Sequence, residues 1–166
     1  MIEGVIHSEN PQEHWAHLNC EGETILDLGC GFWTQEERDS GNGTAKYFIG
    51  QNPKQYIGVD SNAGDIKRLS AEFSSGVFFE KSITSKQDIL SLINQFNPTM
   101  IKCDIEGMEI ALFSLENRHS IKEVAIETHN STDIPCLKWM NDVGLNHWRT
   151  DLASFCPEIK IIYGKC

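Results

Sequence analysis

The feature that most constrains the fold is the alternation of short apolar runs with longer amphipathic segments. The apolar runs occupy residues 24–28, 56–60, 76–80, 100–104 and 124–127. Apolar residues at helical spacing occupy residues 62–74, 86–96 and 107–118. Strands and helices that alternate in this way form βαβ units, with a parallel sheet covered on both faces. We therefore predict an α/β fold with five parallel strands in this part of the chain.

The C-terminal part is predicted to extend the sheet by an antiparallel pair of strands. Residues 134–143 have a helical apolar face that ends before Gly144, and strand-like segments follow at residues 145–149 and 159–163. The loop between these segments is too short for a crossover helix, so they must run antiparallel. The prediction is a seven-stranded, mostly parallel sheet with an antiparallel C-terminal strand at its edge and helices on both faces.

The length of 166 residues fits one domain over residues 1–166. Residues 1–23 precede the first of these strands and form an N-terminal arm. Within the arm we expect a helix over residues 11–18, with Asn10 as its N-cap and Pro11 as its first residue.

The charge of the chain limits its partners. There are 14 Lys and Arg against 24 Asp and Glu, which gives a formal net charge of -10. Such a chain repels nucleic acid and anionic lipid, and no basic patch is evident. No apolar run has the ~18–20 residues that a transmembrane helix needs, and the first residues do not resemble a signal peptide. We expect a cytoplasmic protein that binds neither nucleic acid nor membranes.

The cysteines do not suggest a metal site. The sequence has six, and no two have C-x-x-C spacing, so buried or free thiols are the simplest interpretation. His14, His17 and Cys20 have metal-like spacing, but a fourth zinc ligand is not evident. The alternative is an N-terminal helix that packs through its apolar side chains.

A glycine-rich turn follows the first predicted strand, in Asp-Leu-Gly-Cys-Gly at residues 27–31. Glycine lets a backbone turn tightly and approach a ligand closely. A nicotinamide-binding fingerprint would have a third glycine, at the position that Thr34 occupies. The turn therefore indicates either a different nucleotide-like ligand or a plain strand-to-helix connection.

Asp60 ends the second predicted strand, where a carboxylate can accept hydrogen bonds from both hydroxyls of a ribose. It can also cap the helix that follows. The number of residues between the glycine turn and Asp60 exceeds the ~20 that are usual between the glycines and the ribose-binding acid of a dinucleotide site. The excess falls in residues 33–43, which we interpret as a mobile insertion loop over the ligand pocket. Trp33 begins this segment, and either covers an adenosine or sugar ring or anchors the loop.

Three acids, Asp104, Glu106 and Glu109, lie where the fourth strand gives way to a helix. Acids at a helix N-terminus complement the helix dipole, which accounts for the two glutamates. Lys102 needs another explanation, because a central parallel strand has no solvated face. We predict that Lys102 is buried and paired with a carboxylate, either Asp104 or Glu127.

These motifs together resemble those of a known family. Asp-Leu-Gly-Cys-Gly followed by Gly-Val-Asp at residues 58–60 is similar to the cofactor motifs of class I S-adenosylmethionine-dependent methyltransferases. Lys-Cys-Asp-Ile-Glu-Gly-x-Glu at residues 102–109 resembles the signature of the FkbM-type methyltransferase family, and Glu-Thr-His at residues 127–129 resembles its E-x-H. The resemblance implies a Rossmann-like class I methyltransferase fold with S-adenosyl-L-methionine as cofactor.

The resemblance also implies a set of site residues. The residues expected to contact the cofactor are Asp27, Gly29, Cys30, Gly31, Asp60, Ser61, Ser82, Ile83 and Asp104. The glycine turn would line the methionine end, Asp60 would hold the ribose, and Ser82 with Ile83 would lie near the adenine.

Methyl transfer by in-line displacement needs an aligned nucleophile and, for a hydroxyl acceptor, a route for its proton. The candidate catalytic residues are His129, Asp104, Glu127 and Glu106. The ordinary pKa of about 6.5 suits His129 to the role of base, although it could equally cap the strand or the following helix. Asp104, Glu127 and Asn130 offer oxygen ligands for Mg²⁺ or Ca²⁺, so metal assistance is a second possibility.

The expected function is methylation of a small hydroxyl-bearing acceptor, such as a sugar or glycan, at oxygen. Two alternatives stay open. One is a catalytically silent module that binds S-adenosylmethionine, and the other is a different nucleotide-binding α/β enzyme.

Overall fold

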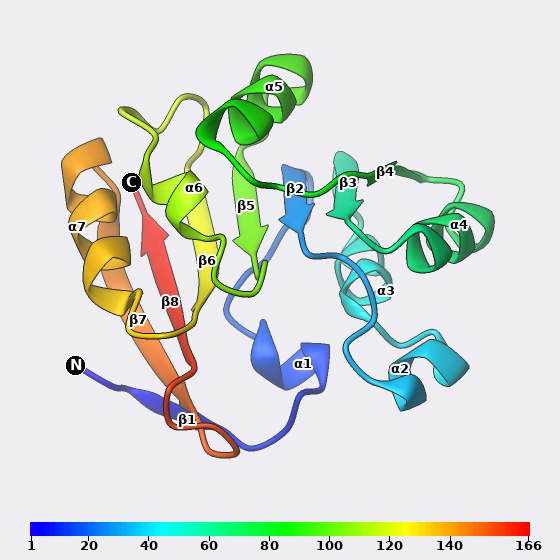
Figure 1. The fold of residues 1–166 in the computed structure, drawn as a ribbon, viewed down its shortest axis with the longest axis horizontal. Helices are drawn as coiled ribbons and strands as arrows, with labels where there is room; N and C mark the ends of the chain where they lie inside the picture. Colours follow the sequence, from blue (N-terminus) through cyan, green and yellow to red (C-terminus); the bar gives the residue numbers. More distant parts are fainter.

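The centre of the computed structural model, which describes residues 1–166, is one mixed sheet of eight strands (Figure 1). The spatial order is β1-β7-β8-β6-β5-β2-β3-β4. The strands are β1 (Gly4–Ile6), β2 (Thr24–Leu28), β3 (Gln55–Asp60), β4 (Gly76–Glu80), β5 (Met100–Cys103), β6 (Glu123–Thr128), β7 (Asn146–Ala153) and β8 (Lys160–Lys165). β8 runs antiparallel to both of its neighbours, and every other pair is parallel.

Helices cover both faces of the sheet, as predicted. The helices are α1 (Pro11–His14), α2 (Gln35–Ser40), α3 (Thr44–Ile49), α4 (Ala63–Glu72), α5 (Lys86–Phe96), α6 (Ile110–Phe113) and α7 (Asp133–Val143). Apolar side chains of α5, α6 and α7 pack in one core cluster with alternate strand residues such as Leu26 and Ile101. Those of α3 and α4 share the second cluster with Trp15, after α1, and with strand residues such as Ile25 and Met100. Consecutive residues of each strand therefore pack on opposite faces of the sheet.

The five predicted parallel strands are confirmed, and so is the C-terminal antiparallel pair. The strand count differs, because Gly4–Ile6 adds β1 beside β7. Three residues are too few to show a hydrophobic period. The position of the reversed strand was also wrong, since β8 lies between β6 and β7 and not at the edge. The helix α7 carries the chain past one strand position, and β8 returns to fill it.

The helices differ from the predictions near the site. The segment 33–43, expected as a loop, contains α2, which Thr34 begins with a capping box to Glu37. The helix expected over residues 11–18 is a single turn, although its Asn10 cap and its initial Pro11 are confirmed. The helix expected over residues 107–118 forms only as α6. Its start is delayed because Glu106 and Gly107 adopt φ values of 53° and 91°, outside the helical range.

The topology creates a crevice at the carboxyl end of β2. From β2 the chain proceeds to β3 and β4 on one side, then crosses to β5 on the other. Ligands of open α/β sheets bind at such a switch point. No helix here has the length and apolar character to span a membrane.

Candidate active site

The glycine turn after β2 is shaped by its contact with the chain that follows β5. Gly29 adopts a φ of 80°, and a Cβ placed there would lie 1.7 Å from the backbone oxygen of Asp104. Its N–H donates to the carbonyl of Val59 at 2.9 Å. Only glycine tolerates both the positive φ and the close approach. The turn is therefore wedged between β3 and β5.

Lys102 fastens this turn from inside the sheet. The side chain is fully buried, as predicted, and its Nζ donates to the carbonyl of Gly29 at 2.5 Å. Its ion-pair partner is Asp27, with Nζ 3.1 Å from Oδ1, whereas Asp104 is 3.9 Å away. Of the two expected partners, Asp104 is confirmed as the more distant one, and Glu127 was wrong. The closer partner, Asp27, was not predicted, and it meets Lys102 because the strand register places the two residues directly opposite each other. Burial lowers the pKa of Lys102, but the charges of Asp27 and Asp104 outweigh burial and raise it.

Two residues expected to contact the cofactor have side chains in the core. The second oxygen of Asp27 accepts a hydrogen bond of 2.5 Å from the Tyr56 hydroxyl, and Asp27 has no exposed surface. Cys30 is equally buried, and burial raises the pKa of its thiol well above the ordinary value. Both residues therefore support the turn from behind, and their side chains do not line the cavity.

Asp60 is tied to the same turn. One of its oxygens accepts from the Gly31 N–H and the other from the Asn62 N–H, both at 2.8 Å. A Cβ on Gly31 would lie 2.6 Å from the Asp60 carboxylate. Each carboxylate oxygen keeps a free lone pair, so Asp60 can still accept bonds from a ligand. The N-cap of α4 is Asn62, and Asp60 holds the backbone of that cap without being the cap itself. The ribose role of Asp60 stays a prediction.

The other predicted cofactor contacts are farther from the cavity. Ser61 and Ser82 are exposed, and Ile83 is buried in the core cluster of α5. None of the three lines the cavity beside the turn. Their assignment to ribose and adenine stays a prediction.

A cavity of about 160 Å³ lies beside the turn, lined among others by Gly29, Gly31, Asp60 and Asp104. It continues into a polar groove of about 1010 Å³ between the N-terminal segment and α2 with α3. Trp33, which is 55 % exposed, stands at the cavity. The sequence did not reveal that Pro11, His14 and Phe155 also line this cavity, because their approach depends on the tertiary fold.

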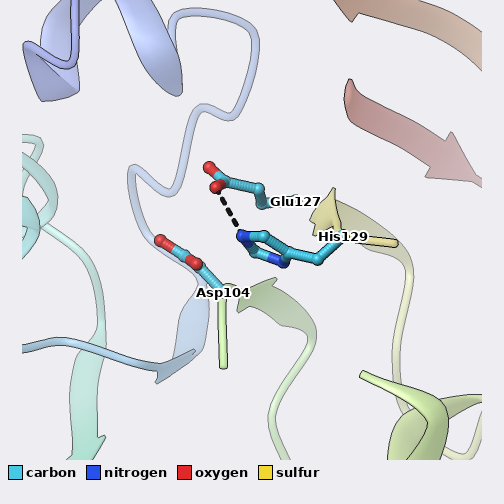
Figure 2. Close-up of side chains that lie close together, drawn as sticks. All are labelled: Asp104, Glu127 and His129. Carbon is cyan, nitrogen blue, oxygen red and sulfur yellow. Dashed lines mark ion pairs between the residues drawn. The ribbon is translucent and has the colours of Figure 1, made fainter. Parts of the chain in front are cut away.

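An acidic cluster occupies the other side of the crevice, where β5 and β6 end. Figure 2 shows Asp104, Glu127 and His129 side by side, and one ligand atom from each lies within 4.8 Å of the others. Because β5 and β6 are neighbouring parallel strands, this convergence confirms the predicted placement of these side chains. Glu106 approaches from the loop after β5, with its Oε2 3.6 Å from the Nε2 of His129.

His129 is held by a residue that sequence reasoning assigned only to the helix dipole. Its Nδ1 lies 2.8 Å from the Oε1 of Glu109, and Glu109 has no exposed surface. Its Nε2 lies 2.9 Å from the Oε1 of Glu127. Glu109 is part of the motif at residues 102–109, so the sequence marked it as a candidate. The sequence did not indicate that its side chain contacts His129.

These contacts change the protonation expected at the cluster. Burial lowers the pKa of His129, but Glu109 and Glu127 outweigh burial and raise it to about 11. The prediction of a near-neutral histidine base was therefore wrong for this arrangement, because two carboxylates flank the ring. Burial, followed by the charge of Glu127, raises the pKa of Asp104 to about 7. Burial also raises the pKa of Glu106.

The histidines of the N-terminal arm have separate partners. His14 contacts the Oε2 of Glu127, so α1 contributes directly to the acidic cluster. His17 lies 3.5 Å from Asp151, and the thiol of Cys20 donates to the carbonyl of Phe48. The three side chains do not converge, which excludes the zinc site that their spacing suggested. Asn130, the third oxygen ligand considered for Mg²⁺ or Ca²⁺, is exposed.

No protein-family model matches this chain, and no curated protein matches it. Solved structures share its fold. An S-adenosylmethionine-dependent methyltransferase from Mesorhizobium loti has a TM-score of 0.63 at 10 % identity, covering 95 % of this chain and 99 % of that one. Fibrillarin from Aeropyrum pernix, with natively bound S-adenosyl-L-methionine, has a TM-score of 0.57 at 14 % identity, covering 89 % and 68 %.

A third similar structure comes from Streptococcus pneumoniae. This candidate tRNA (m1A22) methyltransferase, in complex with S-adenosyl-L-methionine, has a TM-score of 0.60 at 12 % identity, covering 96 % of this chain and 73 % of that one. At these identities the likeness establishes the fold: this chain has the Rossmann-like fold of class I methyltransferases, as predicted.

Proposed function

We propose that this protein is an S-adenosylmethionine-dependent methyltransferase of the FkbM type. The observation that carries the proposal is the tie between Gly31 and Asp60 at the switch point of the sheet, where the Gly31 N–H donates to the Asp60 carboxylate at 2.8 Å. This hydrogen bond joins the glycine turn after β2 to the carboxylate at the end of β3, which is the acid that we assign to the ribose.

The residues around the turn fit the cofactor. Gly29, Gly31 and Asp60 all line the cavity, and the absence of a side chain on Gly31 lets its backbone pack directly against the Asp60 carboxylate. Asp60 would accept the ribose hydroxyls, and Gly29 and Gly31 would line the methionine end. When bound, the cofactor supplies a methyl group on a sulfonium centre that is a good leaving group. Asp104 and Glu106, which also line the cavity, place negative charge on the side where a cation would be stabilised.

The acceptor side favours a small, uncharged, hydroxyl-bearing molecule. The large groove is lined almost entirely by polar side chains, with Lys46 as its one lysine. Hydrogen-bonding groups of this kind suit a sugar or glycan. The carboxylates of Asp104 and Glu106, whose pKa values burial raises, can orient an acceptor hydroxyl and accept its proton, so we propose transfer to oxygen.

RNA is the competing acceptor, because one similar structure is a candidate tRNA methyltransferase. The net charge of -10 argues against it, since an RNA backbone would be repelled over most of the surface. A non-catalytic module that binds the cofactor is the second alternative.

Calorimetry with S-adenosylmethionine, S-adenosylhomocysteine, NAD⁺ and ATP tests the cofactor. We expect binding of the first two alone. Preferential binding of NAD⁺ or ATP would overturn the proposal in favour of another nucleotide enzyme. Transfer of a labelled methyl group to a panel of sugars and to tRNA then tests the acceptor. Label in a sugar supports the proposal, label in tRNA overturns the acceptor class, and binding without transfer to any acceptor favours the silent module.

A further inference from the structure

The Nε2 atom of His129 faces carboxylates and makes no hydrogen bond. It lies 2.9 Å from the Oε1 of Glu127 and 3.6 Å from the Oε2 of Glu106. The contact with Glu127 is not aligned as a hydrogen bond, so the nitrogen is buried without a partner. The side chain of His129 is only 10 % exposed. A lone pair at this nitrogen would point into negative charge, and a positive charge there would be stabilised.

The opposite nitrogen of the ring is fixed by Glu109. The Oε1 of this fully buried carboxylate lies 2.8 Å from Nδ1 and also accepts from the Gly107 N–H at 3.0 Å. In proteins a carboxylate on one imidazole nitrogen sets the tautomer that leaves the other nitrogen free to bind a metal ion. Glu109 thus orients His129 with Nε2 toward Asp104 and Glu127.

The cluster has more negative than positive charge. Four carboxylates, those of Asp104, Glu106, Glu109 and Glu127, surround His129 or approach it. The buried Lys102, 3.9 Å from Asp104, has its closer contacts with Asp27 and with the carbonyl of Gly29. One oxygen of Asp104 is buried without a hydrogen-bond partner. A bound cation would satisfy this oxygen and the Nε2 of His129 together.

We propose that Asp104, Glu127 and His129 bind one divalent metal ion, with Glu109 as the positioning residue behind His129. The three ligand atoms lie within 4.8 Å of one another, so small side-chain rotations can bring them around one ion (Figure 2). Two carboxylates and one imidazole suit Mn²⁺ or Zn²⁺ better than Ca²⁺ or Mg²⁺, which prefer oxygen ligands alone.

The site would leave coordination positions open toward the cavity. Asp104 and Glu127 both line this cavity, as does the more exposed Glu106. If the proposed methyltransferase function holds, an oxygen of the acceptor would occupy such a position. Metal binding itself does not depend on that function.

The competing arrangement is a metal-free ion-pair network in which a proton on Nε2 supplies the positive charge. The two differ in the environment of an added metal ion. Imidazole coordination to Mn²⁺ gives a nitrogen hyperfine coupling in pulsed electron paramagnetic resonance, and an ion adsorbed on surface carboxylates gives none.

The experiment uses the full chain, stripped with EDTA and without S-adenosylmethionine. Mn²⁺ is added and followed by pulsed resonance, and both Mn²⁺ and Zn²⁺ are followed by calorimetry. We expect one site with the nitrogen coupling. His129→Gln should abolish the coupling, Asp104→Asn should weaken binding at least tenfold, and Glu109→Gln should weaken it by about 10–100-fold. Glu116→Gln, which alters an exposed carboxylate paired with Lys86, is the matched control and should bind as the wild type does.

Wild-type protein without nitrogen coupling, or without binding at millimolar metal ion, would overturn the proposal. So would unchanged coupling in a folded His129→Gln variant. The wild-type spectrum is decisive even if a variant fails to fold. Calorimetry with S-adenosylmethionine is independent, so binding of that ligand without metal would sink only the metal site. Metal binding by a protein that does not bind S-adenosylmethionine would contradict only the proposed function.

Discussion

The glycine turn after β2 and the acidic cluster after β5 and β6 lie at the same edge of the sheet but treat their polar groups in opposite ways. In the turn, the carbonyl of Gly29 meets Lys102, and the N–H of Gly31 meets Asp60. In the cluster, Asp104, Glu109 and His129 each keep a buried polar atom without a hydrogen-bond partner. The backbone groups of the glycine turn are hydrogen-bonded, whereas the acidic cluster has buried polar atoms without partners and an excess of negative charge.

The comparison indicates that the glycine turn is the rigid part of the site and that the acidic cluster is its reactive part. A satisfied turn is preorganised, so a ligand that binds there pays little to order it. An unsatisfied buried group is costly, and in native proteins it is concentrated at functional sites. We therefore expect substitutions in the turn to act on stability and cofactor affinity, and substitutions in the cluster to act on metal binding and turnover.

The largest effect is expected from Gly29→Ala. The new Cβ would meet the Asp104 backbone oxygen at 1.7 Å and would keep a φ of 80°. Backbone cannot yield as a flexible side chain can, so we expect a loss of about 5 kcal/mol or more in the free energy of unfolding. Chemical denaturation measures it.

Gly22→Ala is the matched control for Gly29→Ala. Gly22 has a φ of 71° but no atom within 4 Å of its added Cβ, so only the backbone strain of about 1–2 kcal/mol should appear. Equal losses in the two variants would show that the turn is not wedged against the chain after β5.

Lys102→Met should cost about 3–5 kcal/mol, because it leaves the buried Asp27 carboxylate without its cation. The double variant Lys102→Met with Asp27→Asn should recover part of this loss, because it removes the uncompensated charge. Lys86→Met, which breaks an exposed pair with Glu116, should cost less than about 1 kcal/mol. Thermal and denaturant unfolding of all three variants checks the series. A Lys102 loss no larger than that of Lys86 would contradict a structural role for the buried pair.

Asp60→Ala should cost less stability than Gly29→Ala or Lys102→Met and should have a clear effect on cofactor binding. Two charge-assisted hydrogen bonds to the ribose, each worth about 1.5–3 kcal/mol, would be lost, so cofactor affinity should fall at least tenfold. The matched control is Glu80→Ala, because Glu80 stands opposite Asp60 at the end of the neighbouring strand β4. Calorimetry should show normal affinity in the Glu80 variant. Unchanged affinity in Asp60→Ala would refute the ribose assignment and leave the turn as a plain connection.

The sequence by itself determined the five parallel strands from β2 to β6 and the edge of the sheet at which the candidate site lies. Short apolar runs and helical spacing are local signals, so β2 through β6 and helices such as α5 could be predicted closely. Local chemistry also fixed the Asn10 cap of α1. The burial of Lys102 followed from its place in a central parallel strand.

The tertiary structure alone decided which side chains meet. The partner of Lys102 is Asp27 because of the register between β2 and β5, and register joins residues far apart in the chain. The clamp of Glu109 on His129 depends on the positive φ values that redirect the chain after Asp104. The contact of His14 with Glu127 requires α1 to pack over the crevice. The hydrophobic pattern determines on which face of an element a residue lies. Which residues pair across strands depends on the relative positions of whole elements, and the sequence pattern does not specify these positions.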